Sequence, residues 1–393
     1  MRRFQLAILA SILLVTCTGC WDKQEINDIA LVMATSIDMN PDGEYRITSQ
    51  YVIPVRQIGA TPTKEGGGSF MTETATGRTI DEIVKSVQSK LSRKMFVAHR
   101  RVVFIGEKLA KHGIEDILDY FSRNSKSRLR TYVLVVKGRS GVDLLNTDYP
   151  LEFIPTEAVR EMENLDNNVP ATLRDVISAV SSDGLQPATD VVELVEPVDG
   201  SVKSPNSSRF RVSKTAVFKH TKLLGYLNET DTQYYKWLAG RLRFGLLTVE
   251  MGKSKDMVSV AITKPEKTIK TSVNGGEVTI DIHLKGKGNV QENNTRLDLT
   301  NPELLRQVES EASRKIQQTM QRMVEHVQET YSSDIFGFGE ELHRQHKKDW
   351  KTLANNWDQT FKQARVTVTT DFHISSIGMT GPPLQLKERE IEK

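Results

Sequence analysis

The chain has 393 residues, which suits two or three domains better than one. Hydrophobic residues make up 38% and charged residues 26%, so composition excludes a polytopic membrane protein, a collagen-like chain and a wholly disordered chain. The 53 Lys and Arg residues nearly balance the 50 Asp and Glu residues, which leaves no strong electrostatic reason to bind nucleic acid. The two cysteines, Cys17 and Cys20, exclude a disulfide framework and a cysteine-based zinc site.

Residues 1–19 have the pattern of a secretory signal peptide. Arg2 and Arg3 form a positively charged start, and residues 4–15 are apolar. Because this apolar stretch is shorter than the roughly 20 residues of a membrane-spanning helix, it fits a cleaved signal better than a permanent span. We therefore expect the mature chain to begin after residue 19 and to work outside the cytoplasm.

The end of this signal is typical of lipoproteins. Thr18 and Gly19 are small and directly precede Cys20, whose thiol would receive a diacylglyceryl group before cleavage. Cys17 is a departure, because such signals usually carry Leu or another aliphatic residue there. An ordinary signal peptide with an incidental cysteine is the alternative interpretation. We predict lipidation at Cys20, because two or more acyl chains anchor a protein stably to a membrane.

Residues 20–195 are expected to form a mixed α/β region with two subdomains. Apolar runs at 30–38 and 45–53 flank a cluster of turn residues, a pattern typical of a β-hairpin. Thr79 and Glu82 form a capping-box pattern that starts a helix. Hydrophobic periodicity predicts helices at 80–93, 114–121 and 173–180, and strands at 102–105, 132–136 and 191–195.

Residues 196–208 are rich in Pro, Gly, Ser and Asp and form the predicted linker to a C-terminal α+β domain at 209–380. In that domain we expect an antiparallel sheet packed against a long helix, which is capped by Asn301 and runs to about Tyr331. Residues 381–393 form a charged tail. The predicted fold class is therefore α+β and multi-domain, and its other elements are strands at 210–218, 223–227 and 366–374, a meander at 257–292 and a helix at 338–350.

Two stretches bring together residue types that bind metals. Residues 38–43 resemble the start of a calcium loop, but Ser49 stands where the bidentate Glu belongs, so a hairpin turn is the better interpretation. Glu341, His343 and His346 lie in one helical stretch, but their spacing is not that of zinc proteases and basic residues surround them. We expect a solvated helix face and no metal.

The sequence gives no positive case for an enzyme. It contains no nucleophile elbow, no phosphate-binding loop and no dinucleotide-binding fingerprint, and it indicates no cofactor. Lipidation of Cys20 would remove the thiol that remains after signal cleavage. Trp350 and Trp357 are seven residues apart on one helical face, which favours core packing over a binding surface.

A series of short blocks resembles one family. In their order along nearly the whole chain they are similar to the Ger(x)C lipoproteins, the C subunits of spore germinant receptors in endospore-forming bacteria. The blocks are Gly19–Asp22 with Glu25 and Ile26, Gly77 and Thr79, Ser92, Arg93 and His99, Arg123, Ala216–Phe218 with Lys222–Leu227, Leu238–Gly240, Asp334–Gly339, and Trp350, Trp357 and Phe361.

The resemblance implies a mixed α/β protein of three domains without known catalytic activity. It implies assembly with two integral-membrane partners, the A and B subunits, and a lipid-anchored place on the outer face of the cell membrane, which becomes the inner spore membrane. The receptor responds to small nutrients and triggers germination. The family's nutrient specificity is placed in the membrane subunits, so no nutrient pocket is implied here.

Our hypothesis is a scaffold or coupling subunit that stabilises the receptor and transmits its conformational change. The alternative is a stand-alone extracytoplasmic lipoprotein that binds a small ligand itself. Two blocks are candidates either for partner contacts or for a purely structural motif. Their residues are Ser92, Arg93 and His99 in the first half, and Asp334, Phe336, Gly337, Phe338 and Gly339 in the second.

Overall fold

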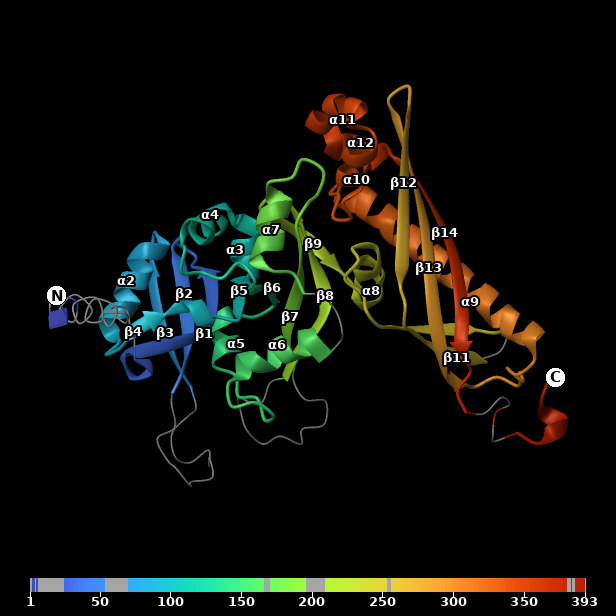
Figure 1. The fold of residues 1–393 in the computed structure, drawn as a ribbon, viewed down its shortest axis with the longest axis horizontal. Coiled ribbons are helices and arrows are strands. Elements are labelled where there is room, and N and C mark those ends of the chain that lie inside the picture. Colours follow the sequence, from blue (N-terminus) through green and yellow to red (C-terminus); the bar gives the residue numbers. More distant parts are fainter. Residues whose placement is uncertain are drawn as a thin grey trace.

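The structure is a computed structural model, and two β-sheets dominate it (Figure 1). A nine-stranded sheet with helices on both faces fills the first half of the chain, and a five-stranded sheet with a long helix fills the second. The residues described are 25–53, 70–165, 170–195, 209–252, 256–379 and 386–392, with the single positions 2, 3, 5 and 383.

The nine-stranded sheet has the order β3-β2-β1-β5-β6-β7-β8-β9, and β4 pairs with the start of β1. Its centre, β1-β5-β6-β7, is parallel, whereas β2, β3, β8 and β9 are antiparallel to their neighbours. Every residue of β5 is buried, as expected of a parallel strand covered on both faces. The bounds are β1 Ile29–Met39, β2 Tyr45–Val52, β3 Phe70–Gly77, β4 Lys94–Phe96, β5 Val102–Gly106, β6 Tyr132–Lys137, β7 Ala188–Val195, β8 Arg209–Lys219 and β9 Lys222–Leu227.

Helices α2, α3, α4 and α7 cover one face of this sheet, and α5 and α6 cover the other (Figure 1). The predicted capping box is confirmed, because the Thr79 hydroxyl accepts from the Glu82 N–H and the Glu82 carboxylate accepts from the Thr79 N–H, both at 3.3 Å. The bounds are α2 Ile80–Lys90, α3 Glu107–His112, α4 Glu115–Arg123, α5 Gly141–Leu145, α6 Pro155–Leu165 and α7 Leu173–Val180, with short 3-10 turns at Ile26–Asp28 and Val97–His99.

The first sheet continues past the predicted linker. Residues 196–208 lie outside the described residues, but β7 before them pairs antiparallel with β8 after them, from Ala188 opposite Val217 to Val195 opposite Arg209. The strands predicted at 210–218 and 223–227 are present as β8 and β9, but they belong to the first sheet. Alternation of apolar and polar residues predicts a strand, but it does not predict to which sheet the strand belongs.

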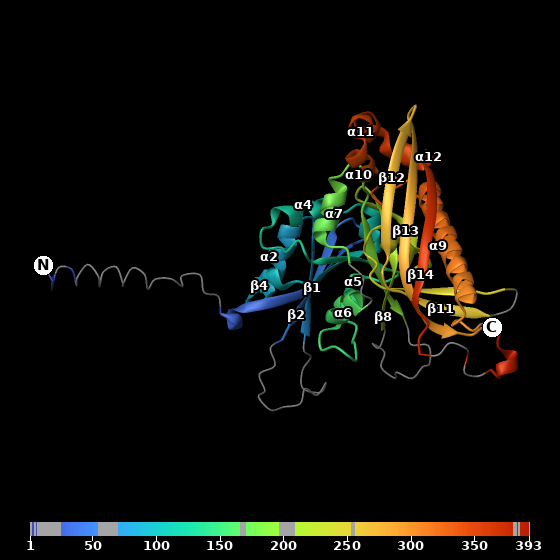
Figure 2. The same cartoon turned by 45° about the vertical axis from the view of Figure 1, so that its right-hand side comes forward.

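The second sheet has the order β10-β11-β13-β12, with β14 beside β13. Its hairpins are antiparallel as predicted, but β14 runs parallel to β13 from Arg365 opposite Thr279, because the chain returns through α9–α12 before forming it. In Figure 2, α9 lies along β13 and β14. The bounds are α8 Glu229–Leu238, β10 Gly245–Glu250, β11 Met257–Ile262, β12 Glu266–Asn274, β13 Glu277–Asn293, α9 Pro302–Thr330, α10 Phe338–Gln345, α11 Lys347–Leu353, α12 Trp357–Gln363 and β14 Arg365–Ser376, with 3-10 turns at Ala354–Asn356 and Glu388–Glu390.

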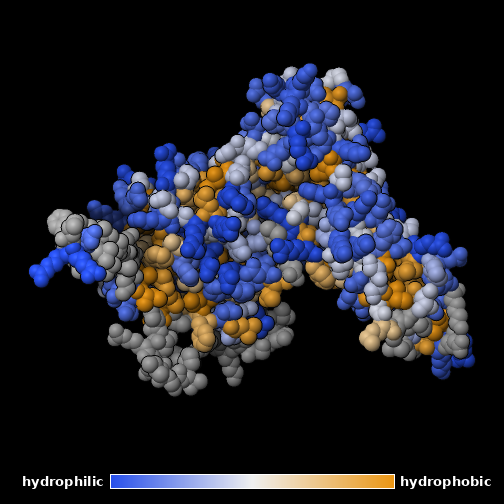
Figure 3. Space-filling view, in the orientation of Figure 1, coloured by the Kyte–Doolittle hydropathy of each residue, from blue (hydrophilic) through white to orange (hydrophobic). Residues whose placement is uncertain are grey.

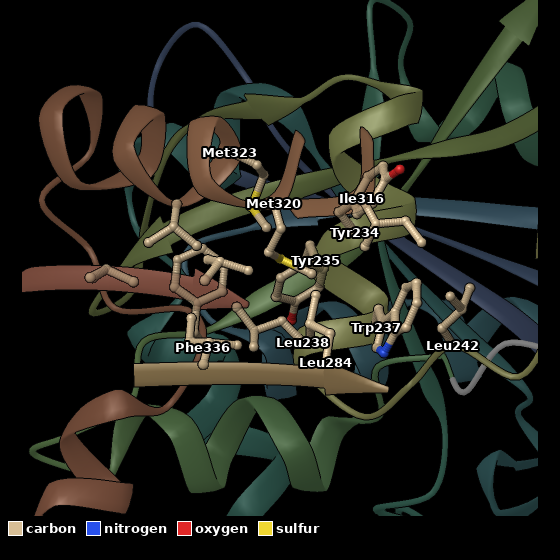
Figure 4. Packing of buried hydrophobic residues seen from close by; sticks show 14 of the residues in the cluster. Tyr234, Tyr235, Trp237, Leu238, Leu242, Leu284, Ile316, Met320, Met323 and Phe336 are labelled. Carbon is tan, nitrogen blue, oxygen red and sulfur yellow. The ribbon is translucent and has the colours of Figure 1, made fainter. Parts of the chain in front are cut away.

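The long helix α9 is the central element of the hydrophobic core in the second half of the chain. Asn301 caps it as predicted, since its side chain accepts from the Glu303 N–H at 2.8 Å. Met320 and Met323 are buried on its inner face and lie beside Tyr235 of α8 in Figure 4. The predicted α+β, multi-domain fold class is confirmed.

The prediction of one helix at 338–350 is wrong. The backbone leaves the helical region at His346, with φ −132° and ψ 62°, and separates α10 from α11. The cause is the neighbouring edge of β12. The Gln345 side chain accepts from the Thr271 N–H at 2.8 Å and donates to the Ile269 carbonyl at 2.9 Å, while His346 Nε2 lies 2.7 Å from the Thr271 carbonyl.

Two other sheet edges are covered by glutamine side chains in the same way. Gln233 of α8 accepts from the N–H of Leu246 on β10 and donates to its carbonyl. Gln321 of α9 accepts from the Val368 N–H and donates to the Val366 carbonyl on β14. Unpaired strand edges are templates for aggregation, so these amides occupy backbone groups that another chain could otherwise pair with.

The surface over α10–α12 is mostly hydrophilic (Figure 3), while the aromatic residues of these helices point inward. Trp350 and Trp357 are buried and meet edge to face, with ring centroids 5.3 Å apart. The prediction that they pack in the core is confirmed. Within the described ranges, no helix is both long enough and apolar enough to cross a membrane.

Candidate functional site

Asp334 is a fully buried carboxyl group in the turn between α9 and α10. Its Oδ1 accepts three backbone N–H groups, from residues 336–338, at 3.0–3.2 Å. Its Oδ2 accepts the Gly339 N–H at 2.8 Å and the indole Nε1–H of Trp357 at 2.9 Å. The side chain therefore organises the whole block that follows it, because a carboxylate can accept all five bonds.

Burial raises the pKa of Asp334 to about 6, and the bonds from the backbone and from Trp357 oppose that rise. A raised carboxyl pKa often marks a catalytic acid. Here both oxygens are occupied and the side chain has no exposed surface, so no substrate can reach the proton. Asp334 is a structural residue of this turn.

The rest of the block needs glycine at two positions. Gly337 has φ 79°, in the left-handed region that side chains with a Cβ disfavour. At Gly339, a Cβ would lie 2.6 Å from the Gly184 Cα and 2.6 Å from Trp357 Nε1. Phe336 and Phe338 pack against each other with ring centroids 5.1 Å apart, so the two aromatic positions of the block are core residues.

The same block joins the two halves of the molecule. The Asp334 carbonyl accepts the Gln186 N–H at 2.8 Å, and the Gly184 carbonyl accepts the Glu340 N–H at 3.2 Å. The Ser182 hydroxyl also donates to the Glu340 carboxylate at 2.9 Å. The segment between α7 and β7 is thus bound directly to the start of α10. Of the two candidate interpretations, this geometry supports a structural motif for Asp334–Gly339.

A cleft of about 530 Å³ opens beside this block, and we call it the junction cleft. Leu185 contributes to it from the first half, and the segment after α8, strand β12, and α10 with the residues just before it contribute from the second. Its polar lining is dominated by charged side chains: Arg241, Lys267, Glu340, Glu341 and Arg344.

Ser92 and Arg93 lie in the turn that follows α2. Gln88 closes this turn, since its amide donates to the Arg93 carbonyl at 2.9 Å and accepts the Met95 N–H at 2.8 Å. The backbone of this block is thus tied to its own helix, and the exposed Ser92 side chain stays a candidate for a partner contact.

His99 lies in the 3-10 turn before β5. Burial, followed by the charges of Arg101 and Arg128, lowers the pKa of His99. This block lies far from Asp334, as β4 and α10 in Figures 1 and 2 show. The structure therefore does not bring the candidate residues together. Cys20 lies outside the described residues, so its lipidation stays a prediction.

The two metal-like stretches have other structural roles. Asp38 is the second-last residue of β1 and accepts from the Ser36 hydroxyl at 2.6 Å and from the Gly141 N–H at 3.0 Å. The predicted hairpin turn follows at residues 40–44, between β1 and β2. His343 stacks on Trp350 while His346 contacts β12. In the described part of the chain, no three His, Cys, Asp or Glu side chains are grouped as metal ligands would be.

Sequence reasoning missed the junction cleft and its cations. Arg241 follows α8, and Lys267 lies on β12, so only the tertiary fold brings them to one cavity. Neither residue belongs to a motif. The one available signal is Gly240, which directly precedes Arg241 and whose φ of 72° marks a turn after α8.

Two family models match the chain. The one described as Spore germination protein N-terminal domain matches residues 22–194, and the one described as Spore germination B3/ GerAC like, C-terminal matches residues 213–378. Putative spore germination protein YfkR of Bacillus subtilis is 27% identical over 366 residues, covering 92% of this chain and 93% of the relative. Spore germination protein KC of Bacillus subtilis is 22% identical and covers 98% of each chain.

A solved structure of the GerBC protein shares the fold. Its TM-score is 0.57 at 18% sequence identity, and the match covers 87% of this chain and 96% of that one. None of the descriptions of these relatives names an enzyme. The predicted resemblance is confirmed along most of the chain: this protein belongs to the Ger(x)C family of spore germination proteins.

Proposed function

We propose that this chain is a lipid-anchored, non-catalytic subunit of a nutrient germinant receptor. The observation that carries the proposal is the match of both family models, in order, behind a signal that ends at Cys20. In this proposal the chain lies on the outer face of the cell membrane and assembles with the integral-membrane A and B subunits. Its role is to support assembly of the receptor and its signalling.

The physical basis of the proposal is local concentration. Acyl chains on Cys20 would hold the folded domains at the bilayer, so binding to membrane partners becomes an encounter on one surface. The buried Asp334 block supports a scaffold role, because it fixes the second half of the chain to the segment at Gly184. A subunit that transmits a conformational change needs such a defined connection between its halves.

The anchor is tested by mass spectrometry of the N-terminal peptide and by membrane fractionation. We expect a diacylglyceryl-modified Cys20 at the N-terminus of the wild-type protein, and loss of the Cys20→Ala variant from the membrane fraction. Cys17→Ala is the matched control, because residue 17 would be removed with the signal, and it should leave the modification in place. An unmodified Cys20, or a Cys20→Ala variant that stays on the membrane, would refute lipid anchoring.

The junction cleft favours one second candidate, a lipoprotein that binds a small ligand by itself. Its volume of about 530 Å³ falls in the range of small-molecule sites. The two proposals differ in the partners that they predict. A stand-alone binding protein would be isolated from membranes without polytopic proteins, whereas a receptor subunit would be isolated together with them.

A further inference from the structure

The junction cleft contains two cationic groups, Arg241 and Lys267, for which the structure records no ion pair with a carboxylate of the described residues. The pKa of Arg241 is nevertheless raised, first by Tyr235 and then by the more distant charges of Asp190, Asp175 and Glu163. Of these, Asp190 is itself bound to Lys236 at 2.8 Å. Arg241 is partly buried, so water solvates it incompletely, and a partly desolvated guanidinium favours an anionic partner.

Lys267 is the second cation of the cleft. Its ammonium donates to the Leu238 carbonyl, which closes α8, and it forms no ion pair with a described carboxylate. Desolvation lowers the pKa of Lys267, while the charge of Glu341 opposes that effect. The ammonium is therefore held in place by a neutral acceptor, with its charge only partly compensated.

The carboxylates of the cleft are already engaged. Glu341 accepts from the Arg344 guanidinium and from the Gln345 amide. Glu340 accepts from the Ser182 hydroxyl of the first half. Among the side chains that line the cleft, three cations (Arg241, Lys267 and Arg344) face two carboxylates (Glu340 and Glu341).

We infer that the junction cleft binds a small organic anion, a carboxylate that carries an apolar group. Arg241 and Lys267 face the carboxylate, and the side chains of Leu185, Ile269 and Phe336 line the cleft for the apolar part. Leu185 belongs to the first half of the chain and the others belong to the second. A bound anion therefore contacts both halves and stabilises their junction. This inference deepens the second candidate function, a small-ligand site in this cleft, and does not depend on the receptor role.

The test is calorimetric titration of the full chain in detergent micelles at constant ionic strength. Benzoate is the probe, and benzamide is a neutral molecule of nearly the same shape. We expect saturable binding of benzoate and none of benzamide. Arg241→Gln should weaken benzoate binding by at least about tenfold, because it removes the guanidinium that meets the carboxylate. Arg243→Gln is the matched control, since Arg243 is exposed and outside the cleft, and it should bind like the wild type.

Circular dichroism of each variant shows whether it folds. If Arg241→Gln does not fold, Lys267→Gln takes its place, because its amide can still donate to the Leu238 carbonyl while the charge is lost. Benzoate binding that is absent, that matches benzamide, or that falls equally in Arg243→Gln would overturn the inference.

Discussion

At the residue scale, Asp334 shows how this chain keeps a charged group in its interior. Four backbone N–H groups and one indole N–H take the place of water around the carboxylate. The residue types of the block are visible in the sequence, but their role is not. Local pattern cannot reveal that Trp357, more than twenty positions away, donates the fifth bond, because that contact exists only after α10–α12 have folded.

Asp334→Asn should destabilise the fold. The asparagine amide would place an N–H₂ donor where the N–H groups of Gly339 and Trp357 now donate, and at least one of these donors would be left unsatisfied. We expect a loss of about 2–3 kcal/mol in the free energy of unfolding at pH 7. Urea denaturation measures it. Asp349→Asn, on the exposed side of α11, is the control and should change stability by less than about 0.5 kcal/mol.

The raised pKa of Asp334 predicts a pH dependence of stability. Its folded-state pKa of about 6 lies above its ordinary value of 3.8, so the folded state binds the proton more tightly than the unfolded state. The resulting stabilisation is complete below pH 3.8 and is lost as the pH rises through 6. The free energy of unfolding of the wild type, minus that of Asp334→Asn, should fall by about 2 kcal/mol between pH 4 and pH 7. A difference that stays constant or grows with pH would contradict this assignment.

At the scale of elements, sequence periodicity located most of the strands and the long helix, but it missed the strands β3, β4 and β10. It also failed where a side chain forms hydrogen bonds to the backbone of a distant strand. The helix predicted at 338–350 breaks because Gln345 and His346 bond to β12. The sequence also could not predict that β8 and β9 belong to the first sheet, because strands of either sheet can have the same alternation of apolar and polar residues. Short helices such as α5 and α8 were missed, since their few apolar positions give little periodic signal.

Gly339→Ala tests the contact between the halves. The added Cβ would lie 2.6 Å from the Gly184 Cα, which is backbone and cannot rotate away. We expect a loss of about 2–3 kcal/mol in the free energy of unfolding, measured by urea denaturation. Gly240→Ala is the control. Its Cβ meets nothing within 4 Å, so its φ of 72° should cost only about 1 kcal/mol. An equal loss of unfolding free energy in both variants would show that the close approach of Gly339 and Gly184 does not contribute to stability.

At the scale of the whole molecule, the two halves are connected at several points. Gln186 and Gly184 bond to the Asp334 block, and the buried pair of Asp190 on β7 and Lys236 on α8 adds a second connection. These connections are the structural feature on which the proposed scaffold role depends.

The most direct test of the proposed function is co-purification from detergent-solubilised spore membranes. Wild-type chain and the Cys20→Ala variant, each tagged at the C-terminus, are compared at equal expression. We expect polytopic A and B subunits to co-purify with the wild type and to be depleted with the variant. A wild-type chain that is membrane-bound but isolated without polytopic partners would contradict the receptor-subunit proposal and would favour a stand-alone binding lipoprotein.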